Sequence, residues 1–168
     1  MTHPRVGNGL DVHPFQTEAV DGGEQALVLA GVEVAGSVPL VGHSDADVVA
    51  HAVADALLGA AALGDLGSRF GVDAPHTAGA DSLGLLRAVA RDVSDAGWRV
   101  GNLDVTVVAQ RPRLAPHRKA MRHNLADATG VDVDDVAVKF TTTDGLGAIG
   151  RAEGIAAWAT CLLVPLRG

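Results

Sequence analysis

GHSDADVVAHAVADALLGAAALGD, residues 42–65, is the stretch that decides the fold, because it combines a strong helix pattern with regularly spaced polar residues. Ser44 is suited to cap a first turn, and Asp47 follows three positions later as the acid of a short capping box. This pattern predicts a helix that begins near Asp45. One broad apolar face must pack against another element, and it consists of Val48, Val49, Ala52, Val53, Ala56, Leu57 and Ala60.

A row of polar side chains borders that apolar face. Asp47, His51 and Asp55 are each about one helical turn apart, which places them in line. The helix alone leaves two interpretations open. Either the two carboxylates are solvated and His51 is a partly buried histidine at the edge of the core, or the row belongs to a functional site.

The N-terminal segment RVGNGLDVHP, residues 5–14, provides a partner for His51. Its apolar residues and its terminal proline predict a short strand. Asp11 and His13 are two positions apart, so a strand places both side chains on the same face. A D-x-H pattern is common by chance, but a carboxylate beside an imidazole is also a natural pair of metal ligands.

Length and composition limit the classes of protein that fit. The 168 residues suit one domain, residues 1–168, and a hydrophobic content of 48% is enough for a sizeable core. Aromatic residues make up 3% of the chain and the formal net charge is −7, which together argue against nucleic-acid binding. If the ligand of such an acidic protein is an anion, a metal must supply the compensating charge.

The cysteine count and the hydropathy pattern narrow the choice further. Cys161 is the sole cysteine, which excludes an internal disulfide framework and a four-cysteine zinc site. No N-terminal signal segment is evident, and the long apolar stretches are interrupted by Gly, Pro or charge. We therefore expect no membrane association and a cytoplasmic location.

The remaining segments predict the order strand, hairpin, helix, helix, strand, helix, strand, strand. This order indicates an α+β fold in which helices pack on one side of a mixed β-sheet. Residues 64–67 are expected to form a turn, and residues 69–79 an irregular flap over the site. The later elements are expected at residues 81–95, 98–109, 117–129, 136–140 and 154–166.

A threonine triplet follows one of the predicted strands. Thr141, Thr142 and Thr143 offer hydroxyl and backbone N–H groups that suit a phosphate, although threonine also favours strands by propensity alone. Asp144 comes next and could hold an ion that prefers oxygen ligands, such as Mg²⁺. At the start of the first helix, His43 can present a donor to an anion or can simply cover the helix end.

The best metal-binding set combines the strand with the first helix. Asp11, His13 and His51 supply one carboxylate and two neutral imidazoles, which suit Zn²⁺ and leave a fourth tetrahedral position for a ligand. A zinc hydrolase is one alternative, and its candidate general bases are Asp47, Asp55 and Asp65. A non-enzymatic trimeric protein with structural zinc is another, and it would need closed coordination by four residues.

Three blocks of sequence, in order, extend over nearly the whole chain: RVGNGLDVH, GHSDADVVAHAVADALLGAAALGDLG and TTTDGLGAIGRAEGIA. They resemble the 2-C-methyl-D-erythritol 2,4-cyclodiphosphate synthase family of non-mevalonate isoprenoid biosynthesis. The resemblance implies a homotrimeric α+β enzyme, a phosphorus-oxygen lyase, with active sites between subunits. Its implied reaction converts 4-diphosphocytidyl-2-C-methyl-D-erythritol 2-phosphate to the cyclic diphosphate and releases CMP.

The resemblance also implies functions for individual residues. It places Zn²⁺ on Asp11, His13 and His51, and Mg²⁺ or Mn²⁺ on Asp144. His43 and Thr142 correspond to catalytic groups that stabilise the transition state, and residues 109–115 correspond to the segment whose backbone reads cytosine. The implied substrate-binding positions are Asp11, His13, Ser44, Asp65, Leu66, Gly67, Ala109, Pro112, Arg113, Leu114, Ala115, Thr141, Thr143, Asp144 and Arg151.

The chain departs from the family pattern at several positions. Asn8 stands where many relatives have His, and Asp144 where many have Glu, whose longer side chain would reach a second metal differently. Val72 and Ala74 lie in a flap that usually reads close to F-P-D-T-D. None of these departures removes an expected zinc ligand.

Overall fold

The computed structural model describes residues 3–17, 26–42, 44–71 and 81–166. Four strands form one sheet in the order β1-β6-β4-β5, in which β4 and β5 are parallel and the other neighbours are antiparallel. The expected α+β class with a mixed sheet is therefore confirmed. The strands of this sheet are β1 (Arg5–Pro14), β4 (Trp98–Val108), β5 (Val136–Thr141) and β6 (Gly154–Pro165).

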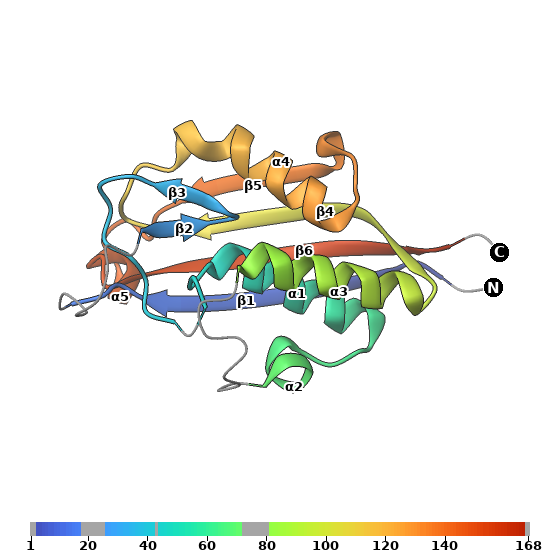
Figure 1. Cartoon of the computed structure of the whole chain (residues 1–168). Helices are drawn as coiled ribbons and strands as arrows, with labels where there is room; N and C mark the ends of the chain where they lie inside the picture. Colours follow the sequence, from blue (N-terminus) through green and yellow to red (C-terminus); the bar gives the residue numbers. More distant parts are fainter. Residues whose placement is uncertain (1–2, 18–25, 43, 72–80, 167–168) are drawn as a thin grey trace.

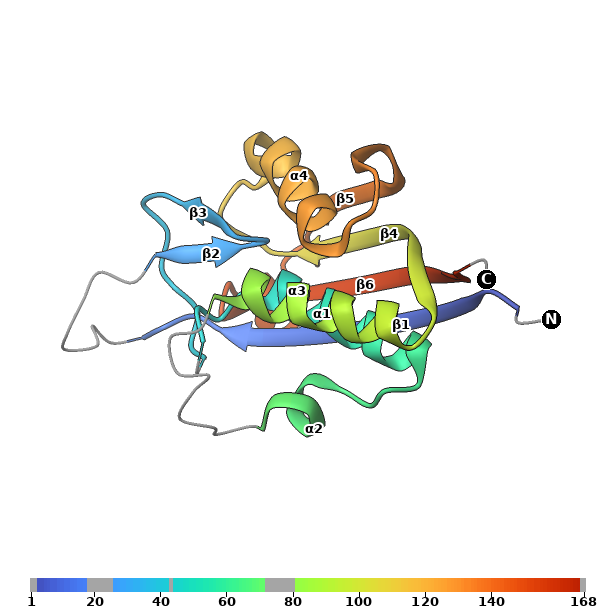
Figure 2. The same cartoon turned by 45° about the vertical axis from the view of Figure 1, so that its right-hand side comes forward.

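Helices cover one side of this sheet, as Figures 1 and 2 show. This layer consists of α1 (Val48–Ala61), α3 (Ser82–Asp95) and α4 (Arg118–Thr129). The short helix α2 (Leu66–Phe70) packs beside α1, and α5 (Gly147–Gly150) lies at the end of β6. Short 3-10 turns at Ala115–His117 and Val133–Asp135 precede α4 and β5. The expected hairpin is present as β2 (Leu27–Leu29) and β3 (Val32–Val34), which pair with each other outside the main sheet.

Helix α1 lies directly on β1 and β6 and forms the centre of the core. Its apolar residues are buried as its periodicity predicted. Gly7 and Gly9 of β1 face the helix, and a side chain at either position would collide with the helix backbone. This close approach brings the polar edge of α1 against the end of β1, where Asp11 and His13 lie.

The other side of the sheet carries exposed apolar side chains. Val6, Leu10 and Val12 of β1 retain 69%, 55% and 54% of their accessible surface, and Trp158 of β6 retains 51%. Leu10 and Trp158 are direct partners in the antiparallel ladder, so these side chains lie on one continuous face. The hydrogen-bonded pair Asn8 and Thr160 lies between Val6 and Leu10 on this face. Exposed apolar side chains gathered in this way are typical of a surface that another protein chain covers.

The start of α1 differs from the expectation. The helix begins at Val48 and is capped by Asp47, whose side chain accepts hydrogen bonds from the amides of Val49 and Ala50. Prediction of a start near Asp45 with Ser44 as the cap was therefore wrong. Asp47 is the helix cap instead, because its carboxylate also accepts hydrogen bonds from the amides of Ala30 and Gly31 in the β2–β3 turn.

Two short helices were not expected. Residues 64–67 were predicted to be a turn, but Asp65 caps α2 and forms a reciprocal capping box with Ser68. Arg69 and Phe70, assigned to an irregular flap, belong to this helix, and residues 72–80 lie outside the described residues. The glycine-rich segment after Asp144 forms α5. Across the described ranges, the structure contains no helix long and apolar enough to span a membrane.

Candidate metal centre and active site

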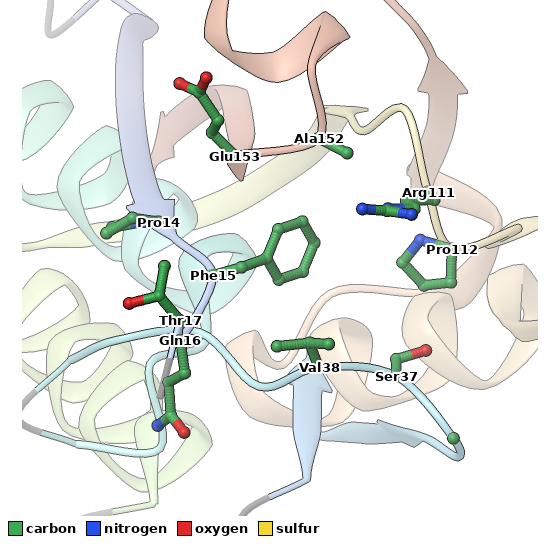
Figure 3. A pocket seen from close by; sticks show the side chains of 11 residues that line it. Pro14, Phe15, Gln16, Thr17, Ser37, Val38, Arg111, Pro112, Ala152 and Glu153 are labelled. Carbon is green, nitrogen blue, oxygen red and sulfur yellow. The ribbon is translucent and has the colours of Figure 1, made fainter. Parts of the chain in front are cut away.

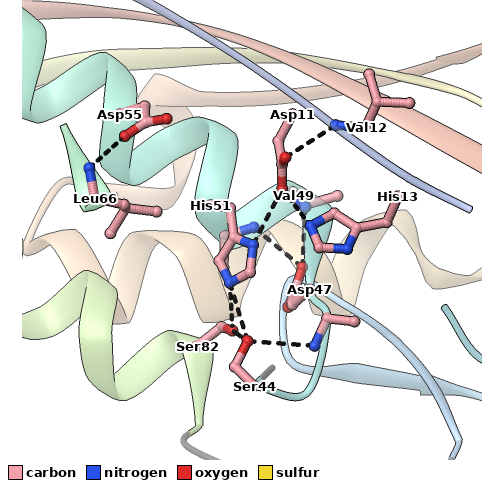
Figure 4. Close-up of polar contacts among 12 residues, drawn as sticks. Asp11, Val12, His13, Ser44, Asp47, Val49, His51, Asp55, Leu66 and Ser82 are labelled. Atoms are coloured by element: carbon pink, nitrogen blue, oxygen red, sulfur yellow. Dashed lines mark hydrogen bonds and ion pairs between the residues drawn. The ribbon is translucent and has the colours of Figure 1, made fainter. Parts of the chain in front are cut away.

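The structure brings Asp11, His13 and His51 together at the contact between β1 and α1 (Figure 4). One potential ligand atom from each residue lies within 4.8 Å of the other two. Oδ2 of Asp11 is 3.0 Å from Nε2 of His13 and 3.0 Å from Nδ1 of His51. All three side chains are partly buried, so a shared ligand at this point would be shielded from bulk water.

The outward nitrogen of each histidine ring also has a partner. Nδ1 of His13 lies 2.5 Å from the carbonyl oxygen of Val41, which can only accept. Gly42 makes this approach possible, because a Cβ there would lie 3.1 Å from the His13 ring. Nε2 of His51 lies 3.0 Å from the hydroxyl of Ser82 and 3.2 Å from that of Ser44. Both rings are thus held with their other nitrogen toward Asp11.

Electrostatics favours an ionised carboxylate between two imidazoles. Burial opposes ionisation, but hydrogen bonds and charge from His13 and His51 outweigh it and hold the pKa of Asp11 well below its usual range. The hydrogen bond from Asp11 raises the pKa of His13, against the opposing effect of burial. Without a cation, the carboxylate provides the charge that stabilises a protonated His13.

The donor set fits a divalent metal. Two imidazole nitrogens and one carboxylate oxygen are a common ligand set for Zn²⁺, and three protein ligands leave a position for another molecule. These residues line a cavity of about 250 Å³, whose other walls are Ser44, Asp55, Leu66, Gly67, Phe70, Gly71 and Leu85. A small ligand in this cavity would therefore reach the metal ligands directly.

The two other acids of the α1 row have different environments. Asp47 is fully buried, so the interpretation of this residue as solvated was wrong, and its oxygens are occupied by four backbone amides. Burial raises the pKa of Asp47 to about 6, although hydrogen bonds from Ala50, Gly31 and Ala30 oppose this shift. Asp55 is half-buried at the cavity wall and accepts from the amide of Leu66 at 2.8 Å. Burial also raises the pKa of Asp55.

A second cavity, of about 300 Å³, contains the expected cytosine-reading segment. It is lined by Ala109, Pro112, Arg113, Leu114, Ala115, Thr141 and Thr142, with four neighbours from the same strands and loop. At its edge, the Thr142 hydroxyl donates to Asp144 at 3.2 Å and accepts from the Asp144 amide at 3.1 Å. Thr143 donates to the carbonyl oxygen of Leu146 instead. None of the residues that line this cavity lines the metal-centre cavity.

Several expected site residues lie away from the metal centre. Arg151 is exposed and forms an ion pair with Glu153 at 2.6 Å. Glu153 lines a third cavity, of about 640 Å³, into which the ring of Phe15 and the side chain of Val38 project (Figure 3). Arg111 and Pro112, which belong to the expected cytosine-reading segment, line both this cavity and the second one. His43, expected to be catalytic, lies outside the described residues.

The sequence analysis missed the residues that contact the candidate metal ligands. Ser82 lies at the start of the helix expected over residues 81–95, and its hydroxyl also contacts His51. Asp45 was taken as the beginning of the first helix, yet it binds both the amide and the hydroxyl of Ser82. The sequence offered one indication that Asp45 and Ser82 are structurally important. Ser and Asp immediately before apolar runs commonly cap the ends of helices.

Comparison with known proteins places the chain in a family. The model of the YgbB family matches residues 4–164. The chain is 54% identical over 160 residues to a 2-C-methyl-D-erythritol 2,4-cyclodiphosphate synthase of Pectobacterium atrosepticum, with 95% of this chain and 93% of the relative covered. Among solved structures, it is similar to the bifunctional IspDF of Campylobacter jejuni, with a TM-score of 0.88, 39% identity, and coverage of 96% of this chain and 42% of that one.

A second solved structure is similar over the full length of both chains. IspF of Plasmodium falciparum, determined as a CDP complex, has a TM-score of 0.83 and 31% identity, and the match covers 98% of this chain and 97% of that one. The agreement therefore extends from sequence to the whole fold. The chain belongs to the YgbB family, among relatives that are 2-C-methyl-D-erythritol 2,4-cyclodiphosphate synthases.

Proposed function

We propose that this chain converts 4-diphosphocytidyl-2-C-methyl-D-erythritol 2-phosphate to 2-C-methyl-D-erythritol 2,4-cyclodiphosphate with release of CMP, as a phosphorus-oxygen lyase. The single observation that carries the proposal is the convergence of Asp11, His13 and His51 at a cavity, in a chain 54% identical to a synthase of that name. In this reaction the substrate's 2-phosphate oxygen attacks the β-phosphorus and CMP leaves. No residue needs to become covalently attached.

Two cations are part of the proposal. Asp11, His13 and His51 would hold Zn²⁺, and Asp144 would hold Mg²⁺ or Mn²⁺. When bound, such cations supply positive charge that offsets the charge of the diphosphate and of the pentacoordinate phosphorus. This agrees with the composition, because a protein with a net charge of −7 needs added positive charge to bind so anionic a substrate.

The chain's own residues position the substrate. Ser44, Asp65, Leu66 and Gly67 would contact the erythritol part, since Ser44, Leu66 and Gly67 line the metal-centre cavity and Asp65 caps the helix there. The Thr141 to Thr143 hydroxyls and Arg151 would bind phosphate oxygens. The backbone of residues 109–115 would bind cytosine. His43 and Thr142 would stabilise the transition state by donating hydrogen bonds to the reacting phosphate.

A homotrimer would complete this site. The metal centre and the Ala109 to Thr142 cavity share no lining residue within one chain. One substrate could span both if the cytosine segment of one subunit lay against the metal centre of the next. The exposed apolar face with Val6, Leu10, Val12 and Trp158 is suited to the contact between subunits.

A zinc hydrolase is the competing candidate, and it would need a general base beside the metal. Asp47 is occupied by four amides. Asp55 is the more suitable candidate, because it lies in the cavity wall and its pKa is raised by burial. However, its hydrogen bond to Leu66 indicates that Asp55 holds the α2 segment in place.

Phosphorus NMR of the products distinguishes the two candidates. Purified protein with Zn²⁺ and Mg²⁺ is incubated with the cytidylated substrate, and the products are followed with time. The synthase reaction gives CMP and a cyclic diphosphate in equal amounts. Hydrolysis to CMP and a linear product that carries two separate phosphates, or no turnover, would rule the proposal out.

A further inference from the structure

Asp45 and Ser82 form a partly buried connection behind the candidate metal centre (Figure 4 shows Ser82 beside His51). We infer that these two residues are positioning residues, which hold the His51 ring so that the lone pair of its Nδ1 points to the cation. This inference rests on the zinc site proposed above. It gives Ser82 and Asp45 a function in metal binding, although neither residue would contact the metal itself.

The direction of the hydrogen bonds follows from what each group can donate. The Ser82 hydroxyl donates a hydrogen bond to Oδ1 of Asp45. A carboxylate accepts, so the hydroxyl proton lies in that bond. The Ser82 oxygen also lies 3.0 Å from Nε2 of His51, where it is left to act as the acceptor. The hydrogen atom between the Ser82 oxygen and Nε2 of His51 is therefore covalently bonded to Nε2.

This direction fixes the tautomer of His51. A neutral imidazole carries one N–H, so a hydrogen on Nε2 leaves the lone pair on Nδ1. Nδ1 is the atom that lies 3.0 Å from Oδ2 of Asp11, on the side of the three donor atoms. Hydrogen bonds to the outer nitrogen of a ligating histidine orient the ring and strengthen its donor atom.

His13 shows the same arrangement with a different partner. Its Nδ1 donates to the Val41 carbonyl at 2.5 Å, and its Nε2 faces Asp11. Each histidine thus has an outer acceptor, a backbone carbonyl for His13 and, for His51, the hydroxyl of Ser82 at 3.0 Å with that of Ser44 next to it at 3.2 Å. A serine hydroxyl is the weaker acceptor, and the negative charge of Asp45 behind Ser82 compensates for this by polarising the Ser82 hydroxyl.

The serine is held firmly enough to orient a ring. Ser82 is 1% exposed and is the first residue of α3. Besides the hydroxyl contact, Oδ2 of Asp45 accepts from the Ser82 backbone amide at 3.1 Å. Because the Ser82 amide and hydroxyl both donate to one carboxylate, the Ser82 side chain has little freedom. The relay from Asp45 through Ser82 to His51 therefore links the loop before α1 to the start of α3.

The inference is tested by replacing the serine hydroxyl and measuring metal binding. Zinc affinity is measured by competition with a chromophoric chelator for the wild-type protein, Ser82→Ala and Asp45→Asn. Ser82→Ala is expected to bind zinc about tenfold to a hundredfold more weakly. Asp45→Asn is expected to have a smaller effect, because asparagine can still accept from Ser82 but carries no charge.

Asp81→Ala is the matched control. Asp81 precedes Ser82 and caps α3 by accepting from the Leu83 amide at 3.0 Å, but it does not contact His51. This substitution disturbs the same helix end without touching the relay. Its zinc affinity is expected to equal that of the wild type.

Proton NMR of the Co²⁺-substituted protein reports the relay directly. The wild type is expected to show two shifted, exchangeable ring N–H signals, one from His13 and one from His51. In Ser82→Ala the His51 signal should shift and exchange faster with water, because Ser44 at 3.2 Å is then the remaining hydroxyl at Nε2, while the His13 signal serves as an internal reference. If Ser82→Ala does not fold, the inference is tested instead by the zinc affinity of Asp45→Asn and by the presence of both ring N–H signals in the wild type.

The possible outcomes separate this inference from the proposed function. Zinc binding by the wild type together with unchanged affinity and both signals in Ser82→Ala would overturn the relay alone. A wild-type His51 that binds the metal through Nε2 would also overturn it. Failure of the wild type to bind zinc at all would overturn the proposed metal centre, and the relay with it.

Discussion

Gly9 of β1 lies so close to Ala52 of α1 that a Cβ added at Gly9 would be 2.0 Å from the Ala52 carbonyl oxygen. The neighbouring helix turn is also close, since the same Cβ would be 2.8 Å from the amide nitrogen of Ala56. This contact sets the distance between strand and helix. It therefore also sets the position of His51 relative to Asp11 and His13.

Gly9→Ala is expected to lower the free energy of unfolding by roughly 3 kcal/mol, because backbone atoms must move apart to admit the methyl group. Chemical denaturation measures the change. Gly59→Ala is the matched control, because Gly59 lies at an exposed position of α1 where an added Cβ meets nothing. That variant should be more stable than the wild type by up to about 1 kcal/mol. Equal effects of the two substitutions would contradict the close contact.

Asp47→Asn tests the buried cap of α1. An amide nitrogen in place of one carboxylate oxygen would face a backbone N–H, as at Gly31, whose amide is 2.7 Å from Oδ2. The expected loss is about 1–3 kcal/mol of unfolding free energy. A variant as stable as the wild type at every pH would show that the four amide contacts contribute nothing.

The pH dependence of that loss follows from the pKa of Asp47. Burial raises this pKa from 3.8 to about 6, so the folded state binds the proton more tightly than the unfolded chain. The stability gained in this way is fully present below pH 3.8 and is lost as the pH rises through 6. Asparagine does not titrate, so the wild type's advantage over Asp47→Asn should be about 1 kcal/mol larger at pH 5 than at pH 8. An advantage that grows toward pH 8 would reverse the assigned direction.

Trp158→Glu tests the exposed face of the sheet as the contact between subunits. A charge in the middle of that apolar patch should convert the proposed homotrimer to monomers, because a buried, unpaired carboxylate is costly. Sedimentation velocity gives the assembly state. Leu63→Glu is the control, since Leu63 is 39% exposed beyond the end of α1 and away from this face. A trimer that survives Trp158→Glu would place the contact elsewhere.

Local patterns predicted most of the fold. The helical spacing of apolar residues identified α1, and the alternation of Asp11 and His13 placed both side chains on the same face of β1. The start of α1 could not be predicted, because Ser44 and Asp47 are both good caps. Contacts with the distant amides of Ala30 and Gly31 decided between them.

The candidate site could be predicted only in part, because it also depends on contacts between residues that are distant in the sequence. The three candidate metal ligands have side-chain chemistry that is visible in the sequence, and the family resemblance grouped them into one site. Ser82 has no such signal, because its function depends on meeting His51 and Asp45, which are 31 and 37 positions away. Helix α2 was a different kind of omission, since the capping pair Asp65 and Ser68 is local and could have been recognised.

His51→Ala should lose zinc while remaining folded. The side chain is at the edge of α1 and is partly buried, so its removal leaves the apolar face of the helix intact. Metal analysis and circular dichroism of the purified variant check both parts. Retention of one zinc per chain would show that His51 is not a ligand.

Titration of zinc into metal-free protein, with Mg²⁺ and the cytidylated substrate present, tests the central claim most directly. The account predicts that CMP release rises linearly with added zinc, stops rising at one zinc per chain, and stays absent in His51→Ala at every zinc concentration. Full CMP release before any zinc is added, or zinc-dependent release by His51→Ala equal to that of the wild type, would contradict it.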